Sequence, residues 1–521
     1  MPSLPAVEST AQALYEQAVA AQREARRADA ERLAVAALAA DPDRQLATRI
    51  QHLRGRILTW GEKTMRAYEL LVTEAMGCES TDPRQATLMW LDASSAALAG
   101  REIEAALHAA LRSVQLGTGA APDLLPVLET QLGLAEILAE SPVAGRARML
   151  AAVRKLEVAD FESWDRVHDT AAALFWLEEY GAARLLLEQL VEQARATGFR
   201  TVLPGALDTM AAIDYRMGRW RAADGRSAEA LRLARELDQT FQISSCLSTL
   251  ASIAAARGEE QACRAYVSEV LKTDEDLFFV GAWARVALGS LALSQGRTDE
   301  AIAVLEQVAS SNPYPDPAIV PWPRELVEAY VRSGRLEQAR GIAEETSARL
   351  AETNRPGLRA VDAHCRGLVA ETASFSDHFE ESLRWHDRTR TPFLRARTEL
   401  AYGERLRRSR RNAAAKTHLQ RALAVFEQLG ARLWAERARA ELATGRRATG
   451  RSNALRDLTP HEVEVALVVG RGATNKEAAA ALYVSPKTID YHLASIYRKL
   501  GVRSRTELAA LLAGGSRSVR G

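Results

Sequence analysis

Apolar residues recur at intervals of three and four along most of the chain, from the N-terminus to about Leu442. This spacing places them on one face of an α-helix. Ala, Leu, Glu and Arg, which favour helices, dominate the same region, and runs of β-branched residues are few. The stretch closest to a membrane span, from Leu277 to Leu293, is too short and is interrupted by Arg285. The pattern therefore predicts an all-α fold without a membrane span.

A glycine followed by polar residues and then an alanine recurs within this helical region. The glycines are Gly181, Gly218, Gly258, Gly296 and Gly334, at successive spacings of 37, 40, 38 and 38 residues. A constant period of this length is typical of a solenoid of helical hairpins, in which each hairpin buries its apolar face against its neighbours. The glycine would end the first helix of each hairpin. From about Phe161 to Asn354 the pattern resembles tetratricopeptide repeats, although their usual period is a few residues shorter.

The helical pattern stops at residue 443, where the chain reads ATGRRATGRSNAL. These residues combine Gly, Ser, Thr and Arg without apolar periodicity, which is typical of a flexible linker. We therefore expect three parts. They are a TPR-like helical solenoid for sensing or interaction at residues 1–442, a flexible linker at residues 443–455 and a small domain at residues 456–521.

Charge is distributed unevenly between these parts. The whole chain holds 68 Lys and Arg against 67 Asp and Glu, a net charge of +1. Residues 444–521 alone hold 13 basic and 6 acidic side chains, a net charge of +7, which leaves −6 on the preceding 443 residues. A basic C-terminal module suits the phosphates of a nucleic acid.

The chemistry of several other protein classes is missing from the sequence. The cysteines, Cys78, Cys246, Cys263 and Cys365, form no CxxC pair, which argues against a zinc site or a disulfide framework. The N-terminus lacks the basic and apolar segments of a signal peptide. The string GRILTWGEKT from Gly55 has the wrong spacing for a phosphate-binding Walker A loop. We therefore expect a cytoplasmic protein with no catalytic residue, metal site, cofactor or membrane contact.

Signals for four short helices follow one another after the linker. Thr459 caps the first helix, and Glu462 stands three residues beyond this cap, as in a capping box. Thr474 caps the second helix, which runs through an alanine-rich segment to Leu482. Only three residues separate this helix from the next, and the last of them, Ser485, is its cap. Two helices that meet across so tight a turn form a helix-turn-helix unit.

The third helix is the candidate recognition helix of this unit. One apolar stripe on it faces the core of the small domain, formed by Ile489, Leu493, Ile496 and Leu500. The opposite side would meet base edges in a major groove, through Lys487, Asp490, Tyr491 and Ala494. Arg498 lies on the same side of the helix, where it would meet base edges or phosphates of the DNA. His492 flanks the apolar stripe, and we therefore interpret it as a structural residue.

The sequence from Leu458 to Leu512 resembles the LuxR-type DNA-binding domain without a gap. Matching positions include Thr459, Glu462, Gly472, Asn475, Lys476, Glu477, Ser485, Thr488, His492, Ile496, Lys499, Leu500, Gly501, Val502, Arg505, Glu507 and Leu508. The resemblance implies contacts with the DNA backbone by Thr474, Asn475, Lys476, Thr488 and Arg498. It also implies that the last helix, residues 504–512, pairs two copies on DNA.

Asp490 departs from this resemblance, since many members carry Lys at the position. A carboxylate there would accept a hydrogen bond from the amino group of cytosine, whereas Lys favours guanine. Asp490 is therefore the residue from which we expect a difference in operator preference.

Helical repeats ahead of such a domain resemble the MalT-like large ATP-binding regulators, the LAL family. In that family a nucleotide-binding domain precedes the repeats, and none is visible in this sequence. The resemblance implies a sequence-specific transcription regulator, more specifically an activator. The implied partners are double-stranded DNA, RNA polymerase, an unknown protein or small-molecule effector at the repeats, and a second copy of the chain on DNA.

Two questions stay open at this stage. A repeat-based interaction scaffold with vestigial DNA binding is the alternative function, because helix-turn-helix units also occur in protein-binding domains. The tryptophans of the repeats would either line an effector pocket on the concave face or belong to the repeat core. They are Trp176, Trp220, Trp283, Trp322 and Trp385.

Overall fold

The computed structural model describes residues 10–24, 26–59, 63–100, 102–139, 142–155, 164–272, 280–311, 317–351, 353–454 and 458–513. Every regular element in these ranges is a helix, which confirms the predicted all-α fold. No helix within them is long and apolar enough to cross a membrane. Residues 455–457 and 514–521 of the predicted linker and C-terminal domain lie outside the described residues, as do residues 60–62 of the GRILTWGEKT string.

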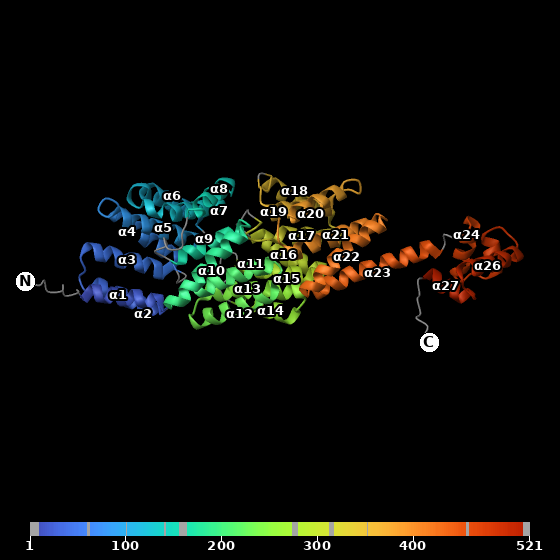
Figure 1. The fold of residues 1–521 in the computed structure, drawn as a ribbon, viewed down its shortest axis with the longest axis horizontal. Helices are drawn as coiled ribbons and strands as arrows, with labels where there is room; N and C mark the ends of the chain where they lie inside the picture. The colour runs from blue at the N-terminus through green and yellow to red at the C-terminus, as the bar shows by residue number, and fades with distance from the viewer. Residues whose placement is uncertain are drawn as a thin grey trace, which may run out of the picture. The chain divides into compact units, whose positions relative to one another are not determined.

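The helices before the C-terminal domain follow one another as hairpins (Figure 1). The first are α1 Thr10–Arg23, α2 Arg27–Ala39, α3 Arg44–Thr59, α4 Thr64–Cys78, α5 Pro83–Ala99, α6 Ile103–Ala120, α7 Leu125–Leu138 and α8 Pro142–Val153. The central ones are α9 Trp164–Trp176, α10 Tyr180–Thr197, α11 Leu203–Arg216, α12 Trp220–Glu236, α13 Thr240–Arg257, α14 Glu260–Val270, α15 Val280–Ser294 and α16 Thr298–Ser311. The last are α17 Trp322–Ser333, α18 Leu336–Arg349, α19 Pro356–Val369, α20 Phe375–His386, α21 Pro392–Arg408, α22 Asn412–Leu429 and α23 Arg432–Ala454.

The chain divides into two compact units. The first unit comprises Met1–Thr398 and Val425–Leu433, and the second comprises Glu399–Ala424 and Trp434–Gly521. The first unit therefore contains most of the helical repeats, and the second contains the C-terminal domain.

A residue in the left-handed conformation ends the first helix of five consecutive hairpins. Its φ angle is +65° at Glu178, +75° at Gly218, +80° at Gly258, +78° at Gly296 and +82° at Gly334. The residue five positions later is small and fully buried in each case: Ala183, Ala223, Cys263, Ala301 and Ala339. The predicted role of glycine is confirmed at four of these turns, where its missing Cβ makes a positive φ accessible without strain.

The prediction for the first of these turns is wrong by three residues. Gly181 lies within the first turn of α10, and Glu178 takes the left-handed position instead. A non-glycine residue in this conformation costs about 1–2 kcal/mol. The Glu178 carboxylate compensates, since it accepts a hydrogen bond from the backbone N–H of Gly357 at 2.7 Å.

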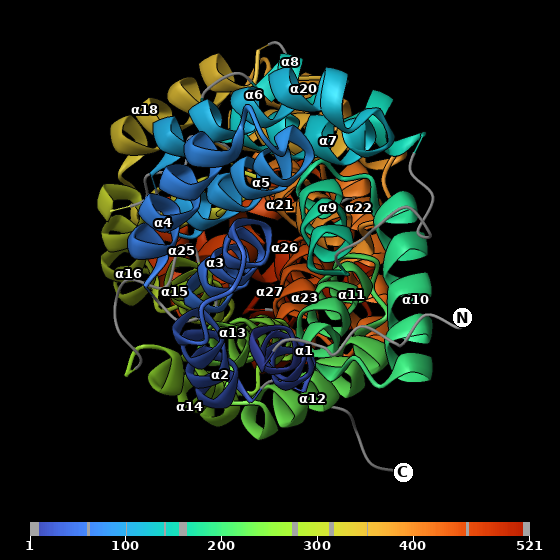
Figure 2. The same cartoon turned by 90° about the vertical axis from the view of Figure 1, so that its left-hand side faces the viewer.

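This hydrogen bond joins parts of the first unit that are 179 residues apart. Arg355 adds a second link, because its guanidinium donates to the carbonyl of Trp176 at 3.1 Å. Gly357 makes the close approach possible, since a Cβ there would lie 2.5 Å from a Glu178 carboxylate oxygen. The helices of the first unit wind around a common axis, as the end-on view shows (Figure 2). The turn before α10 thereby meets the start of α19.

We expected a flexible linker at residues 443–455. The structure instead has a helix over most of this segment, because α23 continues to Ala454. Buried residues such as Trp434 and Ala438 anchor its first half. Once a helix is nucleated, each further residue adds a hydrogen bond, and Ala and Arg have high helix propensity. The absence of apolar periodicity therefore did not exclude a helix here. The boundaries of the three predicted parts and the flexibility between them stay a prediction.

Candidate nucleic-acid interface

Residues 458–513 form the helices α24 Pro460–Gly470, α25 Asn475–Ala481, α26 Pro486–Leu500 and α27 Arg505–Ala513 (Figure 1). The first three begin at the predicted caps, where a hydroxyl oxygen accepts the backbone N–H three residues later. These caps are Thr459, Thr474 and Ser485. Glu462 and Glu477 accept the backbone N–H of Thr459 and Thr474 in return, which completes two capping boxes.

The turn between α25 and α26 is that of a helix-turn-helix unit. Leu482 ends α25, Tyr483 follows with a φ of +57°, and Ser485 caps α26. The Tyr483 side chain is 97% exposed. In units of this kind the second helix is the one that enters the major groove of DNA.

The apolar stripe of α26 faces the core of this domain, as predicted. Ile489, Leu493 and Ile496 are buried, and Leu500 is partly buried at the edge of the same cluster. The other buried members of the core come from α24, α25 and α27 and from the segment before α24, and among the residues that the structure describes none lies outside 458–512. The domain therefore has a hydrophobic core of its own.

The opposite face of α26 is open to solvent. Lys487, Asp490, Tyr491, Ala494 and Arg498 are all exposed, and Tyr491 reaches 75%. An exposed tyrosine on a short basic domain is available for contact with a partner. The geometry thus satisfies the requirement for a base-reading face, and the contact of each residue with DNA stays a prediction.

The residues assigned to the DNA backbone by resemblance fall into two groups. Lys476 and Arg498 are exposed cations. Thr474 donates its hydroxyl to Glu477 at 2.8 Å, and the Thr488 hydroxyl lies 2.8 Å from that of Ser485. Both threonines therefore maintain helix caps, and their role toward phosphate stays a prediction.

Asn475 and Asp490 are brought together by a contact that the sequence did not reveal. The Asn475 amide nitrogen donates to the Asp490 carboxylate, and its oxygen accepts from the Arg505 guanidinium at 3.1 Å. Arg505 also donates to the carbonyl of Ala473. The carboxylate of Asp490, a candidate base-reading group, is thus held by the amide of Asn475. Arg505, the first residue of α27, holds this amide in turn. The match of Arg505 to the family pattern was the signal that marked this position.

Glu462 connects α24 to the recognition helix. Its carboxylate accepts hydrogen bonds from Lys499 at 2.7 Å and from Ser495 at 2.7 Å, both on α26, in addition to the capping bond. The Lys499 ammonium, the Thr459 N–H and the Ser495 hydroxyl lower the pKa of Glu462 to about 2. Sequence reasoning identified this residue only as a cap, although it also fixes the orientation of α26.

Replacing Glu462 by Gln is expected to make the C-terminal domain less stable at pH 7 and less sensitive to acid. The pKa of Glu462 in the folded domain, about 2, lies below the value near 4.3 of an unfolded chain. The interactions of its carboxylate therefore stabilise the domain above about pH 5, and this stabilisation is lost as the pH falls toward 2. Circular dichroism melts of residues 456–521 between pH 7 and pH 2 measure the effect.

Glu464→Gln provides the matched control for this measurement. The Glu464 side chain is 59% exposed on the same helix, and its loss should leave the acid profile close to that of the wild type. An acid profile of the Glu462 variant equal to that of the wild type would contradict the assigned ion pair.

His492 is partly buried beside the apolar stripe. Its ring packs edge-on against that of His461, with ring centroids 5.2 Å apart. This contact between α26 and α24 supports the interpretation of His492 as a structural residue, which stays a prediction.

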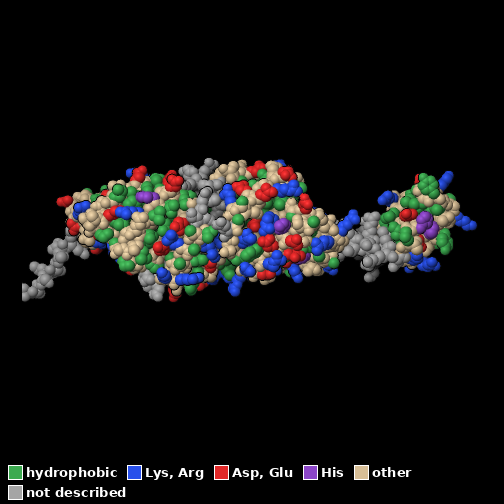
Figure 3. Space-filling view, turned by 90° about the horizontal axis from the view of Figure 1, so that it is seen from above, with side chains coloured by type: hydrophobic (Ala, Val, Ile, Leu, Met, Phe, Trp, Pro, Cys, Tyr) green, Lys and Arg blue, Asp and Glu red, His purple; other side chains and the backbone are tan. Residues whose placement is uncertain are grey.

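The space-filling view shows how charge is arranged on one face of the molecule (Figure 3). Lys and Arg side chains project from the margin of the C-terminal domain, and few Asp and Glu side chains accompany them there. On the helical repeats the two signs are interspersed (Figure 3). The visible surface thus agrees with the uneven distribution of charge along the sequence.

Two protein families match parts of the chain. The family described as bacterial regulatory proteins, luxR family, matches residues 456–512, and a tetratricopeptide repeat family matches residues 292–356. The first match includes the whole of α24, α25 and α26. The second includes α16, α17 and α18, with two of the left-handed glycine turns.

Several curated proteins are similar to a short part of the chain. The transcriptional regulatory proteins ComA and LnrK of Bacillus subtilis (strain 168) are 50% identical over 56 residues and 46% identical over 57 residues. In each case this is 11% of the chain and 26% of the relative. The putative HTH-type transcriptional regulator Rv0890c of Mycobacterium tuberculosis (strain ATCC 25618 / H37Rv) is 47% identical over 51 residues, 10% of the chain and 6% of the relative. The chain thus spans between 6% and 26% of the length of these relatives.

Among solved structures, the chain is similar to the crystal structure of the APC/C hetero-tetramer Cut9-Hcn1, with a TM-score of 0.39 at 12% identity. The likeness covers 97% of this chain and 96% of that chain, and it is too weak to support an argument. The domain assignment rests instead on the capped helices, the tight turn and the family matches. The chain therefore carries a DNA-binding helix-turn-helix domain of the LuxR type at residues 456–512, preceded by helical repeats of the tetratricopeptide type.

Proposed function

We propose that this protein is a sequence-specific DNA-binding transcription regulator that acts in the cytoplasm as an activator. The observation that carries the proposal is the exposed face of α26, with Lys487, Asp490 and Tyr491, on a domain of the LuxR type. Helix α26 enters the major groove, and these three side chains meet base edges there. Lys476 and Arg498 neutralise phosphates beside the groove.

The helical repeats supply regulation in this proposal. An effector, either a small molecule or a partner protein, binds the repeats and alters how the C-terminal domain engages DNA. Two copies of the chain bind two half-sites, and as an activator the complex engages RNA polymerase. This division of labour agrees with the acidic repeat region and the basic terminal domain.

Selection of binding sites from a pool of random-sequence duplexes tests the proposal. The full chain should enrich one motif, and two copies bound together should give two half-sites about one helical turn, or a multiple of it, apart. Mobility shifts on the enriched duplex should weaken steeply with salt. Enrichment of no motif would contradict specific binding and favour the alternative of a repeat-based scaffold.

The variant Lys476→Ala serves to separate backbone contacts from base contacts. It should weaken binding to all sequences alike and reduce the slope of log K against log salt by about 0.9 for each phosphate that the variant no longer neutralises. The enriched motif should stay the same. A changed motif would instead place Lys476 among the base-reading residues.

A further inference from the structure

Residues 405–424, at the end of α21 and on α22, carry seven basic side chains and no acidic one. This stretch, the basic segment, belongs to the second unit, as does the DNA-binding domain. Residues 458–513 of that domain hold only 7 basic against 5 acidic side chains, and residues 1–404 have a net charge of −13. The positive charge of the chain therefore begins well before the DNA-binding domain.

Several exposed arginines of the first unit are matched by glutamates. The second helices of successive hairpins, α10, α12, α14 and α16, are joined by ion pairs. These pairs are Arg195–Glu229 at 2.7 Å, Arg235–Glu269 at 2.6 Å and Arg264–Glu300 at 2.6 Å. Each hairpin thus supplies carboxylates to cations of the hairpin before it.

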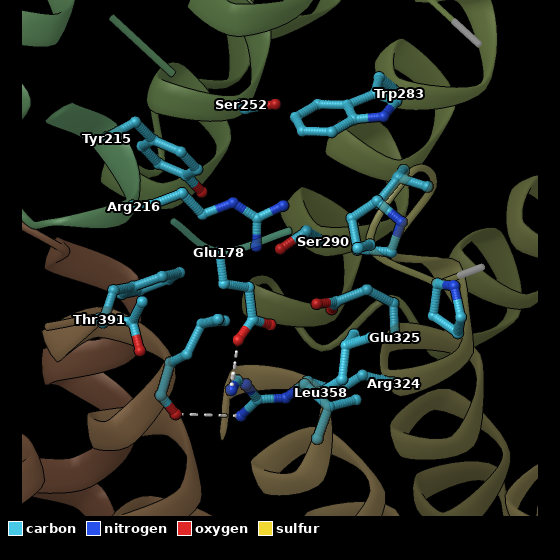
Figure 4. A pocket seen from close by; sticks show the side chains of 18 of the residues that line it. Glu178, Tyr215, Arg216, Ser252, Trp283, Ser290, Arg324, Glu325, Leu358 and Thr391 are labelled. Atoms are coloured by element: carbon cyan, nitrogen blue, oxygen red, sulfur yellow. Dashed lines mark hydrogen bonds between the residues drawn. The ribbon is translucent and has the colours of Figure 1, made fainter. Parts of the chain in front are cut away.

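The buried charges beside a cavity of the first unit are also matched. Arg324 and Glu325 line this cavity, which has a volume of about 110 Å³ (Figure 4). Arg397 donates to Glu325 at 2.9 Å and to Glu328 at 2.6 Å. Both glutamates also oppose the lowering of the pKa of Arg324 by burial. Two guanidinium groups are therefore balanced by two carboxylates.

The basic segment lacks this compensation. Arg410, Lys416 and Arg421 are exposed, and none of them has an ion-pair partner within the described part of the chain. The hairpin of α21 and α22 is the last of the series, since only α23 stands between it and the DNA-binding domain. No later hairpin therefore supplies glutamates to the cations of α22.

Like charges gather at the start of the basic segment. Arg408 is 56% exposed and lies 3.9 Å from Glu404, whose carboxylate already accepts two hydrogen bonds from Arg437. Burial and the charge of Arg408 lower the pKa of Arg405. Neighbouring like charges repel one another and destabilise the compact state. A polyanion bound to this segment would remove that repulsion.

The backbone at Arg410 gives a second, independent observation. Its φ is +61°, and Ala415, five residues later, is small and buried. Arg410 thus takes the left-handed position that glycine has in four earlier hairpins, where a positive φ causes no strain. A hydrogen bond of its own carboxylate compensates at Glu178, whereas the Arg410 side chain makes none within the described residues. Because strained residues cluster at functional sites, an arginine here indicates a contact outside the chain.

We propose that the basic segment binds the phosphate backbone of duplex DNA beside the site that α26 reads. It neutralises phosphates without reading bases, through Arg408, Arg410, Lys416 and Arg421. Arg410 and Arg421 are eleven residues apart, about 16 Å along a helix. They can therefore reach several phosphates, since a duplex carries one charge per about 1.7 Å of its axis.

Duplex DNA is the polyanion that the surroundings of the segment favour. The chain runs from α22 through α23 into the DNA-binding domain. DNA held by α26 is thereby tethered to the unit that contains the basic segment, which raises its effective concentration there. The inference rests on the proposed function, because it adds a flanking contact to the specific contact made by α26.

Two duplexes test the proposal on the full chain. The short duplex ends at the selected motif, and the long duplex continues with unrelated sequence for about two helical turns on each side. Fluorescence anisotropy at about 0.15 M salt should show at least about ten-fold tighter binding to the long duplex. The slope of log K against log salt should be steeper on the long duplex, by about 0.9 for each further phosphate neutralised. Equal affinity for the two duplexes would overturn the proposal.

A variant with four glutamines locates the contact. Its substitutions are Arg408→Gln, Arg410→Gln, Lys416→Gln and Arg421→Gln. It should bind the long duplex no tighter than the short one, because the flanking phosphates are no longer neutralised. Its affinity for the short duplex and its selected motif should stay those of the wild type. A retained preference for the long duplex would overturn the assignment to this segment.

A control variant removes the same charge from the first unit. Its substitutions are Arg195→Gln, Arg235→Gln, Arg340→Gln and Arg349→Gln, all at exposed ion pairs. It should keep the full preference for the long duplex, since exposed ion pairs contribute little to stability and these lie outside the basic segment. Loss of the preference in this variant would reduce the effect to net charge and overturn the location.

Arg410→Gly separates contact with DNA from a structural role. Glycine adopts a positive φ without strain, so the melting temperature of the chain should not fall. Binding to the long duplex should nevertheless weaken by about two-fold or more, and the salt slope should decrease by about 0.9. Unchanged binding to the long duplex would overturn the role of Arg410.

The outcome is distinguishable from that of the test of sequence-specific binding. A chain that selects a motif and binds both duplexes equally would retain the proposed function and lose this surface. A chain that selects no motif, yet binds random duplexes more weakly in the four-glutamine variant, would keep the surface and lose the proposed function. Self-association lost in that variant, with DNA binding unchanged, would instead assign the segment to the acidic repeats of a second copy.

Discussion

Simultaneous replacement of Lys487, Asp490 and Tyr491 by alanine is expected to reduce binding to the selected duplex by about 100-fold or more. Each good contact with a base edge contributes about 1–3 kcal/mol of discrimination. All three side chains are exposed, so their removal eliminates contacts with DNA without opening the core of the domain. Mobility shifts with the selected duplex and with a scrambled duplex measure the loss of specific and non-specific binding separately.

Glu464→Ala is the matched control, since it removes an exposed side chain from α24 and not from α26. It should bind the selected duplex as the wild type does. Circular dichroism melts of both variants should stay within a few degrees of the wild type, because surface substitutions usually change stability by less than about 0.5 kcal/mol. Retained preference for the selected duplex by the triple variant would show that another face of the domain reads the sequence.

A second experiment on this face concerns the sequence preference at a single base pair, the one that Asp490 is expected to contact. Its carboxylate shares a hydrogen bond with the Asn475 amide, which Arg505 holds in turn. Asn475→Ala should therefore relax preference at the base pair that Asp490 contacts, while preferences elsewhere in the motif persist. The same selection experiment reports this change.

The helix starts of the C-terminal domain were predictable because their determinants are local. A cap is set by one hydroxyl and a backbone N–H three residues later, and both are visible in the sequence at Thr459, Thr474 and Ser485. The contact of Glu462 with Lys499 is different, since it joins residues 37 positions apart on two helices. The packing of α24 on α26 cannot be deduced from the sequence, and the sequence therefore identifies Glu462 only as a capping residue.

In the repeats, too, local features were predictable from the sequence and contacts between distant residues were not. A glycine that takes a positive φ leaves a periodic trace, and four of the five predicted glycines do lie at left-handed turns. Glu178 leaves no such trace, because its conformation is supported by Gly357, 179 residues away. The hydrogen bond from Arg355 to the carbonyl of Trp176 escaped prediction for this reason too, since these residues meet only after the helices have wound around their axis.

Replacement of Arg397 by alanine is expected to lower the stability of the first unit by about 3–5 kcal/mol, the cost of breaking a buried ion pair. The Arg397 side chain is 2% exposed, and its partners Glu325 and Glu328 are 8% and 5% exposed. Its removal would leave Glu325 and Glu328 in the interior without the guanidinium that donates to both of them. Urea unfolding of the full chain, followed by tryptophan fluorescence and circular dichroism, measures the loss.

A comparison with Arg340→Ala tests whether burial of the ion pair causes the loss of stability expected for Arg397→Ala. Arg340 also contacts a glutamate, Glu337, at 2.5 Å, but these side chains are 41% and 85% exposed. Solvent screens such a pair, and Arg340→Ala should cost no more than about 1 kcal/mol. If the Arg397 interactions act through charge rather than through shape, replacing Arg397 by Met and Glu325 by Leu together should restore most of the stability, because one charge of each sign is removed and Glu328 keeps Arg332 at 3.8 Å. A double variant as unstable as Arg397→Ala would instead assign the loss to the packing of the guanidinium between α17 and α21.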